Sequence, residues 1–201
     1  MKHVTHWING RTYVPTEDVP PTDRVDAALS AIRDKAVDLI DPERSGDIYD
    51  PATGKVSGTV DFASVRIMDE AVAAASAAFV EWGNTSITKR TQVMFAFREL
   101  LNAHKEDVAA LITEEHGKVL SDALGEVTRG LEVVEFACGI PHLLKGGYSS
   151  GVSSSVDVYS IRKPLGVVGI ITPFNFPAMV PMWFFPIAIA AGNTFIVKPS
   201  E

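Results

Sequence analysis

The part of the chain that most constrains its fold is the stretch from Gly166 onward, which reads as a strand, a helix and a second strand. The run "GVVGIIT" is apolar without alternation, as in a strand buried on both faces. Residues 177–191 are long enough for a helix, Gly192 follows it, and "NTFIVK" is again β-branched and apolar. This order predicts a βαβ unit and an α/β fold with a parallel sheet. Because two parallel strands alone leave apolar faces and edges exposed, we interpret the chain as the N-terminal portion of something larger.

The residues before this unit predict strands followed by helices. "NG" in "HWINGRTYV" favours a tight hairpin, and "YDPATGKVSGTV" a turn and a strand. Apolar spacing predicts four helices. They lie near 24–40, after a cap at Ser64, from near Thr88 to Gly117, and from about Ser121 to Pro141. Val156 and Val158 alternate with polar neighbours, which indicates an antiparallel strand.

Composition excludes several classes of protein. The net charge of −7 disfavours a nucleic-acid or anionic-membrane surface, because both need clustered basic residues. The start "MKHVTHWING" has no apolar h-region, so no secretory signal is expected. No membrane-spanning run is expected either, since the longest apolar stretch is short and contains prolines. A single cysteine, Cys138, fits a reducing cytoplasm. The five histidines lack metal-ligand spacing, so we expect no metal site.

Polar residues follow both predicted strands of the βαβ unit. "TPFNFP" comes after the first strand and "KPSE" after the second, so both should lie at the edge where open α/β sheets bind ligands. The Asn175 amide could donate to a developing oxyanion, and Lys198 and Glu201 could bind cofactor hydroxyls. Alternatively, Asn175 holds a turn and the charged residues form a solvated pair. There is no G-x-G-x-x-G fingerprint, P-loop or nucleophile elbow to decide the matter.

The run from "GVVGIITPFNFP" to "FIVKPSE" closely resembles the aldehyde dehydrogenase superfamily. It is most similar to the CoA-acylating methylmalonate-semialdehyde dehydrogenases, which have "PFNFP" where most of the superfamily has Trp at the position of Phe174. "EEHGKVLSDALGEVTRGLEVVEFACG" and "YDPATGKV" resemble the same group. Apart from residues 15–48, the likeness covers nearly the whole chain.

The resemblance implies a fold and roles for individual residues. Asn175 would be the catalytic oxyanion donor, and NAD contacts would fall on Thr172, Phe174, Lys198 and Glu201. Arg129 resembles the arginine that grips the substrate carboxylate; the alternative is a helix ion pair with Glu126 or Glu132. The implied fold is the N-terminal part of a Rossmann-like NAD-binding domain, with a helical segment and an oligomerisation hairpin.

The resemblance also implies how the chain is divided and what it binds. The divisions would be strands in 1–63 with an inserted helix near 24–40, helices in 64–142, an oligomerisation hairpin in 143–164 and the first βαβ unit in 165–201. We expect a homo-oligomer, a dimer or tetramer, that binds a small semialdehyde. Cys138 lies on an apolar helix stripe and is predicted to be a core residue. The family's nucleophilic Cys would lie beyond Glu201.

The reaction implied for a full-length enzyme uses NAD as oxidant and CoA as co-substrate. A thiolate attacks methylmalonate or malonate semialdehyde, the resulting thioester loses CO2, and CoA takes the acyl group as propionyl-CoA or acetyl-CoA. Two alternatives remain at this point. One is a hydrolytic NAD-dependent aldehyde dehydrogenase, and the other is a non-catalytic short chain without the nucleophile.

Overall fold

The computed structural model describes residues 1–14 and 44–200. They belong to two units, Met1–Ala74 and Ala75–Glu201. The predicted helix near 24–40 and Glu201 lie outside the described residues. None of the helices in the described ranges is long and apolar enough to cross a membrane.

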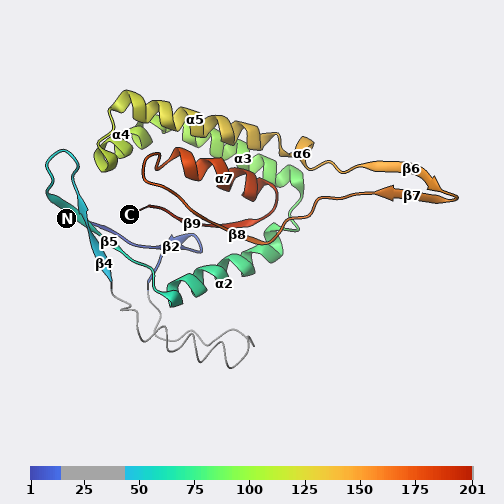
Figure 1. The fold of residues 1–201 in the computed structure, drawn as a ribbon, viewed down its shortest axis with the longest axis horizontal. Coiled ribbons are helices and arrows are strands. Elements are labelled where there is room, and N and C mark those ends of the chain that lie inside the picture. Colours follow the sequence, from blue (N-terminus) through green and yellow to red (C-terminus); the bar gives the residue numbers. More distant parts are fainter. Residues whose placement is uncertain (15–43, 201) are drawn as a thin grey trace. The chain divides into compact units, whose positions relative to one another are not determined.

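The first unit contains short strands and the start of a helix (Figure 1). The central strand of its three-stranded sheet, β5, pairs in parallel with β1 and antiparallel with β4. In the β2–β3 hairpin, Asn9 and Gly10 adopt φ of 53° and 73°, which confirms the predicted tight turn. The elements are β1 (Lys2–Val4), β2 (Trp7–Ile8), β3 (Arg11–Thr12), β4 (Ser45–Tyr49), β5 (Val56–Asp61) and the first part of α2 (Val65–Trp82).

Ser64 begins helix α2 as predicted. Its Oγ accepts the Ile67 N–H at 3.3 Å, so the side chain satisfies one of the backbone donors that every helix leaves free in its first turn.

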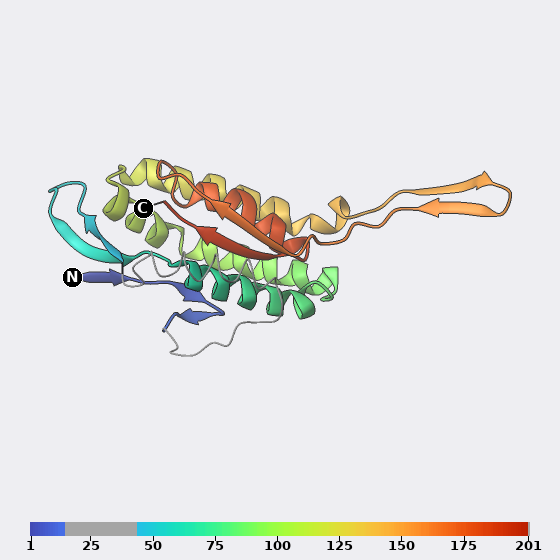
Figure 2. The same ribbon diagram turned by 60° about the horizontal axis from the view of Figure 1, so that its bottom comes forward.

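Helices that pack around α5 dominate the second unit (Figures 1 and 2). The helices α3, α4, α5 and α7 share one buried core, whose members include Leu101, Ile112, Val127, Val134 and Met182. The elements are α3 (Ile87–Ala103), α4 (Lys105–His116), α5 (Leu120–Cys138), α6 (Ile140–Leu143), β6 (Tyr148–Ser153), β7 (Val156–Tyr159), β8 (Val167–Ile171), α7 (Met179–Ala190) and β9 (Thr194–Lys198).

The predicted single helix from Thr88 to Gly117 is wrong, because the chain breaks at His104. His104 has φ −110° and ψ 15°. It is the C-cap of α3, where its N–H donates to Leu100 O, and it is also the N-cap of α4. Two acidic residues in the first turn of α4, Glu106 and Asp107, favour a new helix start there. The predicted end at Gly117 is confirmed, with a left-handed φ of 78°.

Two close contacts fix α5 in the core. Gly130 has no side chain where α7 crosses, and a Cβ there would lie 2.3 Å from Met182 Cε, far inside contact distance. At the far end of α5, Cys138 is buried with Met94 and Ala190, as predicted for a core residue. Burial, with a smaller effect from Glu135, raises the pKa of the Cys138 thiol and makes it a poor nucleophile.

The predicted βαβ unit is present, with β8 and β9 parallel and α7 between them in sequence. Phe195 contacts Phe185 of α7, so α7 covers the face of the sheet that Phe195 shares with its partner Val168. Ile171 points to the other face by strand alternation and is 79% exposed. The expectation of a strand buried on both faces therefore fails within the described residues, where α7 packs on one face of this two-stranded sheet.

The hairpin β6–β7 extends away from the helices of the second unit (Figures 1 and 2). All of its residues are exposed, including the apolar Tyr148, Val152, Val158 and Tyr159.

Candidate active site

A pocket of about 380 Å³ lies between the start of α5 and the loop that leads from β8 into α7. Its lining residues are Lys118, Asp122, Arg129, Asn175 and Phe176. Two of the residues singled out from the sequence, Arg129 and Asn175, are thus brought to one pocket although they are far apart in the chain.

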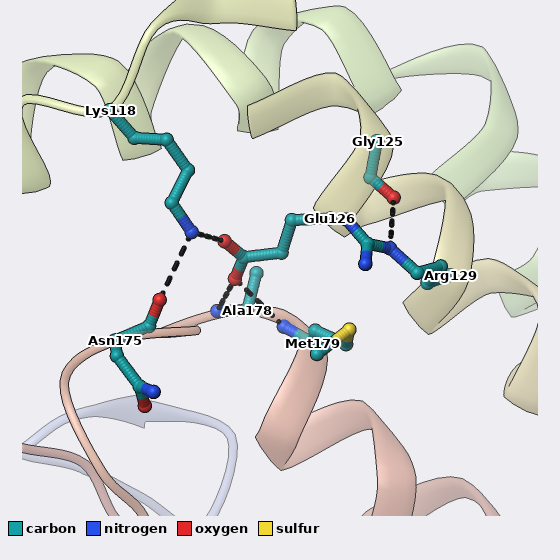
Figure 3. Close-up of polar contacts among 7 residues, drawn as sticks. All are labelled: Lys118, Gly125, Glu126, Arg129, Asn175, Ala178 and Met179. Atoms are coloured by element: carbon teal, nitrogen blue, oxygen red, sulfur yellow. Dashed lines mark hydrogen bonds and ion pairs between the residues drawn. The ribbon is translucent and has the colours of Figure 1, made fainter. Parts of the chain in front are cut away.

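Arg129 reaches the pocket from the exposed side of α5. Its Nε donates to the Gly125 carbonyl one turn earlier at 3.1 Å (Figure 3). The alternative ion pair with Glu126 is not formed, since the Glu126 carboxylate bonds other groups, and Arg129 has no ion pair among residues 1–14 and 44–200. A guanidinium exposed at a pocket without a carboxylate partner can bind an anionic group from solution.

Asn175 lies at the centre of the loop between β8 and α7. Its side chain is exposed and makes no hydrogen bond to any described residue, so the alternative in which the amide holds a turn finds no support there. In Figure 3 the Asn175 backbone carbonyl points toward Lys118, whereas the side-chain amide points away from it. The amide can therefore donate to a bound molecule.

The loop is held by a buried ion pair that the sequence interpretation did not single out. Lys118 Nζ lies 2.6 Å from Glu126 Oε2, and the Glu126 side chain is 0% exposed. The same ammonium donates to Asn175 O at 3.0 Å and lies 4.3 Å from the centre of the Phe176 ring. One cation thus bonds α5 and the loop together (Figure 3).

Glu126 also caps the N-terminus of α7. Its Oε1 accepts the Ala178 N–H at 2.9 Å and the Met179 N–H at 3.1 Å. Ala178 provides no side-chain cap and the first turn of α7 has no acidic residue, so Glu126 supplies the acceptor and the negative charge that a helix N-terminus favours.

The charge of Glu126 is maintained despite its burial. Burial acts to raise the pKa of this carboxyl, but the hydrogen bonds from Lys118, Met179 and Ala178 outweigh it and hold the pKa below its usual value. A sequence signal for this role exists, because Glu126 falls on the buried α5 stripe that contains Ala123 and Val127. A charged residue on such a stripe needs a buried partner.

The candidate cofactor residues gather at the carboxyl ends of β8 and β9. Thr172 is buried, and its N–H donates to Lys198 O at 3.1 Å, which extends the strand pairing by one bond. Lys198 is also the register partner of Ile171, so "TPFNFP" and "KPS" do meet at one sheet edge, as predicted. Phe174 is 68% exposed beside Asn175. Thr172, Phe174 and Lys198 are not among the residues that line the pocket.

Comparison with known proteins identifies the family. The model of the aldehyde dehydrogenase family matches residues 40–201. A malonate-semialdehyde dehydrogenase from Pseudomonas aeruginosa is 51% identical over 163 residues, which are 81% of this chain and 33% of that protein. An acylating, mitochondrial methylmalonate-semialdehyde dehydrogenase from Arabidopsis thaliana is 51% identical over 155 residues, or 77% of this chain and 26% of that protein.

Solved structures agree with these relatives. The crystal structure of a methylmalonate-semialdehyde dehydrogenase from Oceanimonas doudoroffii aligns with a TM-score of 0.84 and 43% identity, over 100% of this chain and 36% of that one. A structure from Sinorhizobium meliloti, assigned to the same enzyme and complexed with NAD, aligns with a TM-score of 0.84 and 41% identity over the same shares. The chain spans about a third of the length of the curated relatives it matches. It belongs to the aldehyde dehydrogenase family.

Proposed function

We propose that this chain is part of an NAD-dependent enzyme that oxidises malonate or methylmalonate semialdehyde and transfers the acyl group to CoA, with loss of CO2. The observation that carries the proposal is the pocket lined by both Asn175 and Arg129, where Arg129 has no ion pair among residues 1–14 and 44–200. These semialdehydes carry a carbonyl and a carboxylate a few bonds apart, so one molecule can use both groups. The names of the relatives support the same substrate class.

Asn175 is proposed to stabilise the oxyanion that forms when a thiolate attacks the aldehyde carbonyl. A neutral amide donor fits this role because it stabilises negative charge without a proton transfer of its own. The thiolate would come from a segment outside residues 1–201, since Cys138 is buried in the core. The aldehyde hydrogen then leaves as hydride, and the substrate carbon becomes a thioester on the enzyme.

Arg129 is proposed to bind the substrate carboxylate before that carboxylate is lost. A guanidinium binds a carboxylate through two parallel hydrogen bonds, which orients the aldehyde toward Asn175. Asp122 lines the same pocket, and no ion pair joins it to Arg129 within the described residues. The β-carboxyl acyl thioester releases CO2, and the carbon that carried the carboxylate takes up a proton. The CoA thiol then loses its proton and attacks the thioester carbonyl, so that the bond to the enzyme sulfur breaks and the enzyme thiolate leaves.

The dinucleotide is proposed to bind at the carboxyl ends of β8 and β9. Thr172 and the exposed Phe174 would contact its nicotinamide side, and Lys198 and Glu201 its adenosine ribose. The residues present fit this group, because an ammonium and an exposed ring stand at the sheet edge where α/β folds bind ligands. NAD, when bound, accepts the hydride.

The hairpin β6–β7 is proposed to pair with a second copy of the chain. Its exposed apolar side chains and its strand edges suit addition to the sheet of another subunit. We propose a cytoplasmic homo-oligomer, in keeping with the single reduced cysteine.

Product analysis tests the proposal. A full-length enzyme that contains this sequence is incubated with malonate semialdehyde, NAD and CoA, and the products are identified by mass spectrometry. Acetyl-CoA and CO2 in equal amounts with NADH are expected. A free acid formed at the same rate without CoA would instead identify a hydrolytic aldehyde dehydrogenase.

A further inference from the structure

We infer that Lys118 and Glu126 are positioning residues that hold the backbone of Asn175 where its amide meets the developing oxyanion. The inference rests on the proposed role of Asn175. Neither residue would touch the reacting atoms; both act on the loop that carries the Asn175 side chain.

Glu126 anchors the C-terminal end of the loop. Glu126 accepts the N–H groups of Ala178 and Met179, which follow Asn175 by three and four residues. Since α5 is packed in the core through Val127 and Gly130, the carboxylate that α5 carries is a fixed point. The start of α7 is therefore tied to α5 by bonds between side chain and backbone.

Lys118 holds Asn175 itself. The Lys118 ammonium is held against Glu126 at 2.6 Å and donates to the Asn175 carbonyl at 3.0 Å. A fixed carbonyl direction restricts the rotation of the adjacent peptide planes, and with it the direction in which the Asn175 side chain leaves the backbone. The contact between the ammonium and the ring of Phe176 restricts the next residue.

Stability alone does not account for a pair of charged groups at this place. A buried ion pair is weak evidence for stability, because apolar residues of similar volume often stabilise as well or better. A helix cap alone needs only an acceptor, which a neutral amide at position 126 would also provide. Only the lysine bonds the Asn175 carbonyl and contacts the Phe176 ring, so its contribution should be seen in the rate rather than in stability.

The test uses a full-length enzyme that contains this sequence and the double variant Lys118→Met/Glu126→Gln. The new side-chain amide at position 126 can still accept from Ala178 and Met179, and no unpaired charge is left buried. The cap of α7 is therefore kept, while the bond to the Asn175 carbonyl and the contact with the Phe176 ring are lost. The control is Arg98→Met/Glu135→Gln, which removes a cation–carboxylate pair of the same length, 2.6 Å, between α3 and α5. The measured quantity is the rate constant of NADH formation in a single turnover.

We expect the double variant to lower this rate constant about tenfold, because small misplacements of a catalytic group are costly. The control should change it less than about twofold, as is usual for exposed pairs. In an Asn175→Ala background the double variant should have almost no further effect, since the group being positioned is already absent. The single variant Lys118→Arg keeps a cationic donor, so its rate constant should fall less than that of the double variant.

Three outcomes would overturn the inference. A rate equal to wild type, or an equal loss with and without Asn175, would mean that the pair only supports the fold. If Asn175→Ala alone leaves the rate unchanged, the proposed oxyanion role fails, and the inference fails with it. Should the double variant not fold, the same cycle with Lys118→Gln, which keeps a donor toward Glu126 but has less reach, gives the decision.

Discussion

The loop that carries Asn175 and the hairpin β6–β7 are both exposed connections, yet they are stabilised in different ways. The loop is held by two residues that are distant in sequence. Lys118, between α4 and α5, and the fully buried Glu126 of α5 both form hydrogen bonds with the loop backbone. In the part of the chain that the structure describes, the side-chain hydrogen bonds of the hairpin run to its own residues. Asp157 accepts from the Tyr148 hydroxyl, the Gly151 N–H and the Ser150 hydroxyl, and these bonds keep its pKa below the usual value.

This difference suits the two functions proposed for these segments. A catalytic donor must be fixed relative to other groups of the site, and bonds to a buried helix achieve that. A surface that pairs with another subunit needs a stable local shape and exposed apolar side chains, but no fixed position relative to a pocket. Changes in the loop network should therefore alter the rate of chemistry, and changes in the hairpin should alter assembly.

The largest effect is expected at the loop. Asn175→Ala should lower turnover by roughly a hundredfold or more, as loss of an oxyanion donor does in other enzymes. Steady-state turnover under conditions where chemistry limits the rate measures this. The NAD dissociation constant serves as control and should be unchanged, since the amide is proposed to act on the substrate. Wild-type turnover would exclude the oxyanion role.

A smaller and selective effect is expected at the other side of the pocket. Arg129→Leu should lower kcat/KM for malonate semialdehyde about ten- to a hundredfold, the loss typical of a hydrogen bond to a charged group. Propanal, which has no carboxylate, should react as with wild type. An equal loss on both aldehydes would contradict the proposed carboxylate site.

The buried carboxylate predicts a dependence of stability on pH. The pKa of Glu126 is lowered in the fold, so its contribution is present above the unfolded value of about 4.3 and is lost as pH falls through the folded value. Glu126→Gln should cost about 1–3 kcal/mol of unfolding free energy at pH 7. Urea unfolding should show that the difference from wild type shrinks in acid.

The matched control for this measurement is Glu135→Gln on the same helix. Glu135 pairs with Arg98 at the surface, where an ion pair contributes about 0–1 kcal/mol. A difference for Glu126→Gln that stays constant down to acidic pH would mean that this carboxyl titrates normally in the fold.

The smallest effect is expected at the hairpin. Asp157→Asn should weaken subunit association by up to about fivefold, because its bonds are exposed, and should leave turnover per assembled site unchanged. Analytical ultracentrifugation measures the association. A loss of turnover without a change in assembly would argue against the separation of the two functions.

Local signals in the sequence were sufficient for much of the fold. The Asn9–Gly10 turn, the Ser64 cap and the left-handed Gly117 depend on residues a few positions apart, and all three are present. The break at His104 was missed because nothing near it resembles the glycine or proline that usually ends a helix. The strand β8 was expected to be buried on both faces, but burial depends on which elements pack on it.

The candidate site was less predictable. Its position at the strand ends follows from the order of strand and helix, and family resemblance pointed to Asn175 and Arg129. The Lys118–Glu126 pair joins residues that contact a loop about fifty positions away, so no local pattern indicates its partners. A charge on the buried stripe of α5 was the only available signal.

The measurement that tests the central claim most directly is a crystal structure of a full-length enzyme containing this sequence with malonate bound. Its two carboxylates stand for the carboxylate and the aldehyde carbonyl of the substrate. We predict one carboxylate paired with the Arg129 guanidinium and an oxygen of the other about 3 Å from the Asn175 amide nitrogen. Malonate bound elsewhere in the full-length enzyme, with neither residue in contact, would contradict the account.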